Sequence, residues 1–159
     1  MIQAFLRRST QKVQEAIYLG STEMVEGGRT HFTPEFLLWG LLDQEGSMLR
    51  DVLEEAASVD DPVGRLRADL AEQIRGMPGG AQSTDGEEAT ITFSKSMKTV
   101  LDNALQEARV MGERYVSTAA LTLALFSDEA GQVAELLQGV GLDHDRVRDV
   151  VLELRGLAQ

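Results

Sequence analysis

The sequence predicts an all-α fold built from two pseudo-repeats of a four-helix unit, with about eight helices in total. Apolar residues recur at three- and four-residue steps along most of the chain, whereas the alternation typical of strands is nearly absent. Capping residues, glycines and prolines divide these periodic stretches into short helices. The second half also repeats the first at a constant offset of 84 residues, which favours a duplicated unit.

The first repeat, residues 1–75, is expected to begin with two helices of different character. A helix that starts near Thr10 is amphipathic and is ended by Gly27-Gly28. The next helix starts at Thr33-Pro34-Glu35, where a capping residue, a proline and an acid follow one another. Its continuation over residues 36–42 is apolar all round, which predicts a buried helix at the centre of a bundle.

The rest of the first half is expected to hold two more helices and a linker. Ser47 and Asp61 start the third and fourth helices, each of which carries one apolar stripe. Residues 76–92 are rich in Gly, Pro and small polar residues, which predicts a flexible linker between the repeats. Residues 89–93 have the composition of a short strand but no evident partner, so we interpret them as the extended end of this linker.

The second repeat, residues 93–159, is expected to form one compact domain with the first. Helices are predicted to start at Ser94, Ser117, Gly131 and Asp143.

Specific residue types coincide when the two halves are superposed at the offset of 84. Gly28 falls on Gly112, and the triplet His31-Phe32-Thr33 falls on Tyr115-Val116-Ser117. Helical leucine stripes coincide by chance, but this glycine and this triplet in a gap-free register favour duplication.

Composition and charge narrow the class of partner. The 159 residues carry 15 basic and 26 acidic side chains, a net charge of −11, which disfavours nucleic acid and anionic membranes as partners. The absence of cysteine excludes disulfides and thiolate chemistry. No apolar run approaches the roughly 18 residues that span a bilayer, and the first residues lack the order of a secretory signal. We therefore expect a cytoplasmic protein.

Catalytic and metal-binding patterns are missing from the sequence, so no enzyme activity, metal or cofactor is expected in this chain. Phosphate-binding loops and nucleophile motifs do not occur, and the two histidines have no partner at metal-ligand spacing. His31 is expected to be a half-buried packing residue, and His144 a solvated residue of a capping turn. A small helical enzyme that uses His31, Glu35 and Glu113 for acid–base chemistry is the least favoured alternative.

Two stretches resemble a known family. Gly112-x-x-Tyr115-Val116-Ser117 leads into Leu121-x-x-Ala124-Leu125, and residues 33–42 form the matching stretch of the first half. Both resemble the Clp repeat, which forms the amino-terminal domain of Clp ATPases. The closing stretch, residues 133–156, is most similar to ClpB-type disaggregases, with the ClpC type second. The resemblance implies an all-helical double repeat joined to AAA+ modules, which bind ATP and form a hexameric ring.

The resemblance also implies a binding function. In this family the domain captures unfolded or aggregated polypeptides, or adaptor proteins, for the ATPase ring. We expect the isolated domain to be a monomer without a cofactor, with ATP bound only by the AAA+ modules of a longer parent. The alternative is a stand-alone accessory protein that regulates a Clp protease or ATPase.

Three polar residues match positions implicated in substrate or adaptor binding in this family. Thr10 matches a threonine at the start of the first helix, Glu113 matches an acid after the second-repeat glycine, and Glu35 matches the acid that starts the buried helix. Ala119 stands where the second repeat usually has an acid, so recognition of phosphoarginine is poorly supported. The structural alternatives are an N-cap for Thr10 and a solvated loop acid for Glu113. From the net charge, clients with basic residues beside an apolar stretch are expected.

Overall fold

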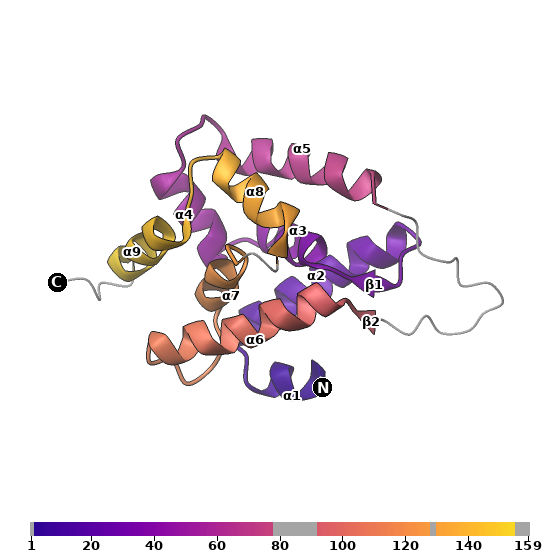
Figure 1. Cartoon of the computed structure of the whole chain (residues 1–159), viewed down its shortest axis with the longest axis horizontal. Helices are drawn as coiled ribbons and strands as arrows, with labels where there is room; N and C mark the ends of the chain where they lie inside the picture. Colours follow the sequence, from indigo (N-terminus) through magenta and orange to yellow (C-terminus); the bar gives the residue numbers. More distant parts are fainter. Residues whose placement is uncertain (1, 78–91, 128–129, 155–159) are drawn as a thin grey trace.

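Helices make up most of the chain in the computed structural model, which describes residues 2–77, 92–127 and 130–154 (Figure 1). The described part also contains two strands of two residues each, β1 (His31–Phe32) and β2 (Thr92–Phe93). The all-α fold predicted from the sequence is therefore confirmed. The helices of the described part are α1 (Ile2–Arg7), α2 (Gln11–Glu26), α3 (Pro34–Asp43), α4 (Met48–Ala56), α5 (Pro62–Arg75), α6 (Lys95–Val110), α7 (Thr118–Ala124), α8 (Gln132–Gly139) and α9 (His144–Leu154).

The helices α3 and α7 form the centre of the core. Every residue of α7 is buried, and the apolar run of α3 is buried apart from Trp39, which is half-buried beneath the guanidinium of Arg67. A helix that is apolar on all sides leaves no face for water, so its neighbours must surround it. The prediction that residues 36–42 lie at the centre of the bundle is confirmed.

Helix starts follow the predicted capping residues. At six of them the side chain accepts a hydrogen bond from the backbone N–H three residues further on, which satisfies one of the unpaired amides of the first turn. Thr33 holds the same position before α3, but its side chain makes no capping hydrogen bond. The residues that cap in this way are Thr10, Ser47, Asp61, Ser94, Ser117 and Asp143.

The repeat seen in the sequence has a counterpart in three dimensions. The bounds of α6 are those of α2 shifted by the offset of 84 residues. Gly28 and Gly112 follow these helices with the same φ of +72°, and each donates its N–H to the carbonyl three residues before it. Glycine adopts positive φ at little cost, so it ends both helices in the same way.

Backbone pairs join the two halves reciprocally. The strands β1 and β2 are parallel, with Phe32 opposite Phe93, and Ser94 N–H donates to Phe32 O at 3.0 Å. The isolated bridge between Ser9 and Val116 is the same pairing shifted by 84 residues, and Thr10 N–H donates to Val116 O at 2.9 Å. Each half therefore supplies the backbone partner for a segment of the other half, which precedes α2 in the first half and α6 in the second.

This pairing corrects the interpretation of residues 89–93. Thr92 and Phe93 are not a linker end without a partner, because they pair with His31 and Phe32. The partner lies far away in sequence and the strand is two residues long, so no periodic pattern reveals it. Residues 89–91, like most of the linker predicted over 76–92, lie outside the described residues.

The expected number of eight helices is too small, because the described part contains α1 as a ninth. Phe5 of α1 is buried in the core and Leu6 packs against it. A helix of six residues is too short to show a clear helical period in the sequence, so α1 was not predicted.

The contact between α2 and α3 depends on two glycines. A Cβ atom added to Gly40 would lie 1.9 Å from the carbonyl oxygen of Ala16, and one added to Gly20 would lie 2.2 Å from that of Phe36. Both neighbours are backbone atoms, so no side-chain rotation relieves the overlap. The two helices approach as closely as they do only because these positions lack a side chain.

We expect Gly40→Ala to lower the free energy of unfolding by about 3 kcal/mol, because the added methyl group forces α2 and α3 apart. Gly139→Ala is the matched control, since nothing lies within 4 Å of a Cβ at the end of α8. That change is expected to be neutral or to stabilise by about 0.5 kcal/mol. Urea unfolding of both variants measures this, and equal stabilities would contradict a close α2–α3 contact.

Candidate functional site

A hollow of about 590 Å³ lies between α1 and α6, within the range of roughly 300–1,000 Å³ usual for ligand clefts. We call it the α1–α6 groove. Its walls are mainly apolar, with three charged side chains among them. The lining residues are Ala4, Phe5, Arg8, Phe93, Lys98, Leu101, Asp102 and Leu105.

The wall formed by α1 is held in place through the Ser9–Val116 bridge. Val116 N–H donates to Arg8 O at 2.7 Å. At the end of α1, the carbonyl of Leu6 accepts hydrogen bonds from the Ser9 hydroxyl at 2.8 Å and from the Gln14 amide at 2.9 Å. These bonds satisfy a carbonyl that a helix end leaves unpaired, and the bond from Gln14 ties the end of α1 to α2.

The opposite wall is held through the β1–β2 pair. The ring of Phe93 stacks on the fully buried Phe32, with 5.0 Å between centroids and 24° between planes. Leu101 is buried on α6, and Leu105, one turn further on, is half-buried. The two reciprocal pairings thus position the two sides of the groove.

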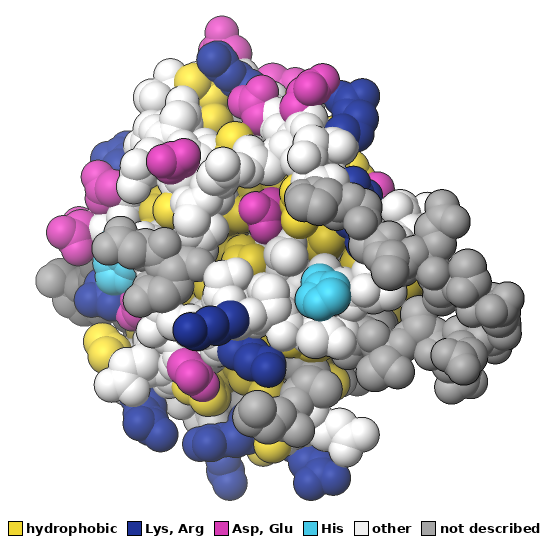
Figure 2. Space-filling view, turned by 45° about the vertical axis from the view of Figure 1, so that its right-hand side comes forward, with side chains coloured by type: hydrophobic (Ala, Val, Ile, Leu, Met, Phe, Trp, Pro, Cys, Tyr) yellow, Lys and Arg dark blue, Asp and Glu magenta, His cyan; other side chains and the backbone are white. Residues whose placement is uncertain are grey.

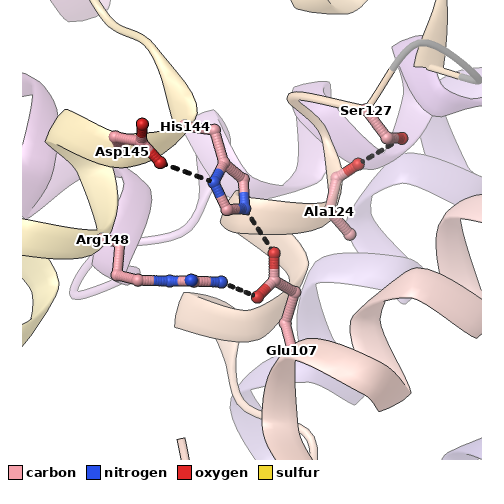
Figure 3. A network of polar contacts seen from close by, with 6 residues as sticks. All are labelled: Glu107, Ala124, Ser127, His144, Asp145 and Arg148. Atoms are coloured by element: carbon pink, nitrogen blue, oxygen red, sulfur yellow. Dashed lines mark hydrogen bonds and ion pairs between the residues drawn. The ribbon is translucent and has the colours of Figure 1, made fainter. Parts of the chain in front are cut away.

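A network of polar contacts links α9 to α6 (Figure 3). The Glu107 carboxylate on α6 contacts Nε2 of His144 and Nη2 of Arg148, both on α9. The side chain of Glu107 is only 13% exposed, whereas that of Asp145, 3.6 Å from His144 Nδ1, is 97% exposed. The expectation that His144 is a solvated turn residue is wrong, because its ring is engaged by Glu107.

The three predicted binding residues do not lie together: two are near the Ser9–Val116 bridge and the third follows β1. Thr10 and Glu113 lie beside the Ser9–Val116 bridge: Thr10 caps α2, and Glu113 accepts a hydrogen bond from the Ser117 hydroxyl at 2.9 Å. Glu35 is half-buried in the first turn of α3, beyond the β1–β2 pair. The N-cap expected for Thr10 is confirmed, and the binding roles of Thr10, Glu35 and Glu113 stay predictions.

The acid–base candidates of the alternative enzyme do not gather around the α1–α6 groove. His31 is exposed, with Nδ1 3.2 Å from the Thr30 hydroxyl, so its expected half-buried packing role is wrong. Neither His31, Glu35 nor Glu113 is among the residues that line the groove.

The residues that line the groove were not identified from the sequence. One signal was present, since Ile2, Phe5 and Leu6 recur at helical spacing. Phe93 and Leu105 carried no such signal, because they line a groove only when α1 packs next to α6.

Within the described part of the chain, no group of three or more His, Asp or Glu side chains is placed to hold a metal ion. The helices described there are also too short or too polar to cross a membrane.

The family model of the Clp repeat (R) N-terminal domain matches residues 8–149. The chain therefore belongs to the Clp N-terminal domain family. ClpC/MecB of Bacillus subtilis, a negative regulator of genetic competence, is 26% identical over 149 residues, 94% of this chain and 17% of its own length. The chaperone protein ClpB of Corynebacterium diphtheriae is 31% identical over 147 residues, 92% of this chain and 16% of its own length. The chain thus spans about one sixth of these relatives.

A solved structure supports the fold. The ClpV N-domain in complex with a VipB peptide has a TM-score of 0.69 and 16% sequence identity, and the match covers 96% of this chain and 89% of that chain. The resemblance to Clp ATPases found in the sequence is confirmed, with both ClpB and ClpC types among the relatives.

We expect Glu107→Gln to lower the free energy of unfolding by about 1–2 kcal/mol, because the Arg148 guanidinium and the His144 ring on α9 lose a largely buried carboxylate partner. Glu72→Gln is the matched control, since its pair with Arg75 is at least 70% exposed on both sides and is worth about 0.5 kcal/mol or less. Thermal unfolding followed by circular dichroism measures both, and similar losses would contradict a role of Glu107 in fastening α9.

Proposed function

We propose that this chain is the polypeptide-binding N-terminal domain of a Clp-type ATPase and that it binds apolar segments in the α1–α6 groove. The segments belong to unfolded or aggregated proteins, or to adaptor proteins. The observation that carries the proposal is the groove itself, an apolar hollow of about 590 Å³ held open by backbone pairings between the two halves.

The physical basis of binding is the removal of apolar surface from water. Leu105 and Phe93 are half-buried, so each still presents apolar surface that an incoming side chain can cover. A shallow, open site of this kind favours moderate affinity, which allows the segment to be released to a translocating ring. The peptide complex of the ClpV N-domain supports the same kind of function here.

The parent protein supplies the energy-dependent step in this proposal. ATP is bound and hydrolysed by AAA+ modules of a hexameric parent in the cytoplasm, and the present chain contributes binding alone as a monomeric module. A stand-alone accessory protein that docks on a Clp protease or ATPase would have the same fold.

We expect the chain to bind a fluorescently labelled, permanently unfolded polypeptide and not its folded counterpart, because only the unfolded form exposes contiguous apolar segments. Fluorescence anisotropy at increasing protein concentration measures both. Equal binding of the two forms would contradict capture of apolar segments, and binding of neither would favour docking to a folded Clp protein.

We expect Leu105→Glu to weaken this binding at least tenfold, about 1.4 kcal/mol, because a carboxylate in the apolar wall must be desolvated when a segment binds. Leu136→Glu is the matched control, since Leu136 is also a half-buried helical leucine but lies on α8 and lines a different hollow. Circular dichroism checks that both variants remain folded. Equal loss in both variants would exclude the α1–α6 groove as the binding site.

A further inference from the structure

We infer that the α1–α6 groove selects apolar segments flanked by acidic residues. The inference rests on the proposed function, because it assigns the chemistry of the segment that the same groove binds. It differs from the expectation drawn from the net charge, which favoured basic flanks.

The first observation is a group of basic side chains without acidic partners. Arg8 and Lys98 line the groove, Arg7 adjoins Arg8 in the sequence, and Lys95 precedes Lys98 by one turn of α6. All four are exposed, and none forms an ion pair with any residue that the structure describes. Asp102 is the single acid of the lining. The groove therefore carries an excess of positive charge that a bound segment can neutralise.

Figure 2 shows this excess on the surface. In this view, basic side chains gather over the lower part of the molecule, with apolar patches between them. Figure 1 places α1 and α6 in this lower part. An apolar strip beside exposed cations complements a segment that is itself apolar in the middle and acidic at its ends.

The second observation is the position of the two lysines on α6. Lys95 is the first residue of this helix and Lys98 lies one turn further on, and the first turn holds no acid. The helix dipole favours acids at this end and disfavours cations, by about 0.3–1 kcal/mol each. The helix dipole thus does not favour these lysines, and no ion pair with a described residue offsets its effect. Contact with an acidic segment would offset it.

The third observation is that, among the described residues, a cluster of acids lies away from the groove. A hollow of about 540 Å³ between α4 and α9 is lined by Glu55, Asp143, Asp145, Asp149 and Glu153, with Arg146 as its one cation. At physiological ionic strength the screening length is about 8 Å, so charges outside the groove contribute little to a segment bound inside it. The local cations therefore outweigh the net charge of −11.

Three labelled peptides test the inference on the full chain. They share one apolar core and carry Glu, Gln or Lys residues on both sides. An exposed ion pair changes affinity by a factor of up to about five, so we expect the Glu-flanked peptide to bind roughly tenfold more tightly than the Lys-flanked one at 0.1 M salt. The difference should shrink to about twofold at 1 M salt, where the screening length is about 3 Å.

Charge reversal locates the effect. In Arg8→Glu/Lys98→Glu the preference should reverse, so that the Lys-flanked peptide binds most tightly. Arg65→Glu/Arg75→Glu is the matched control, because it changes the net charge equally on α5, which lies across the molecule from α1 (Figure 1). This control should keep the preference for acidic flanks.

The outcomes separate the two proposals. If all three peptides bind equally and Leu105→Glu weakens all of them, the groove is the binding site and the charge inference is wrong. A preference for Lys flanks in the unchanged chain also overturns the inference. A preference for Glu flanks that survives Arg8→Glu/Lys98→Glu overturns it as well. If no peptide binds, the proposed function fails and the inference fails with it.

Discussion

The arrangement of the molecule depends on the reciprocal backbone pairing between its two halves. Phe32 pairs with Phe93, and Val116 pairs with Ser9, in equivalent registers. The backbone N–H and C=O groups of these short segments are paired across the two halves, so neither half alone satisfies them. The first pairing places Phe93 in one wall of the α1–α6 groove, and the second fixes α1 as the other. The groove is thus a product of the interface between repeats.

The two halves share equivalent helices, but different side chains at equivalent positions give them different surfaces. Lys98 and Leu105 of the groove stand where α2 has Gln14 and Ser21. At the contact between α2 and α3 the first half has Gly40, whereas the equivalent position of the second half, at the end of α7, is Ala124. The same helical geometry therefore carries different side chains on the equivalent surfaces of α6 and α2.

Charge in this chain acts locally. The acids of α9 and the cations of α1 and α6 lie on separate elements, and salt at physiological concentration screens one group from the other. The Glu107–His144–Arg148 network is the exception, because there a cation meets a carboxylate that is only 13% exposed. Net charge alone is therefore a poor guide to the partner of any one surface.

The sequence by itself determined the helices and their caps, because helical periodicity and capping act within a few residues, as Thr10, Ser94 and Ser117 show. It also determined the repeat, since equal offsets are visible without coordinates. Tertiary structure decided the partner of Phe93, the acid that meets His144 and the groove beneath α1. These join residues far apart in sequence, and only the packing of whole helices brings them together.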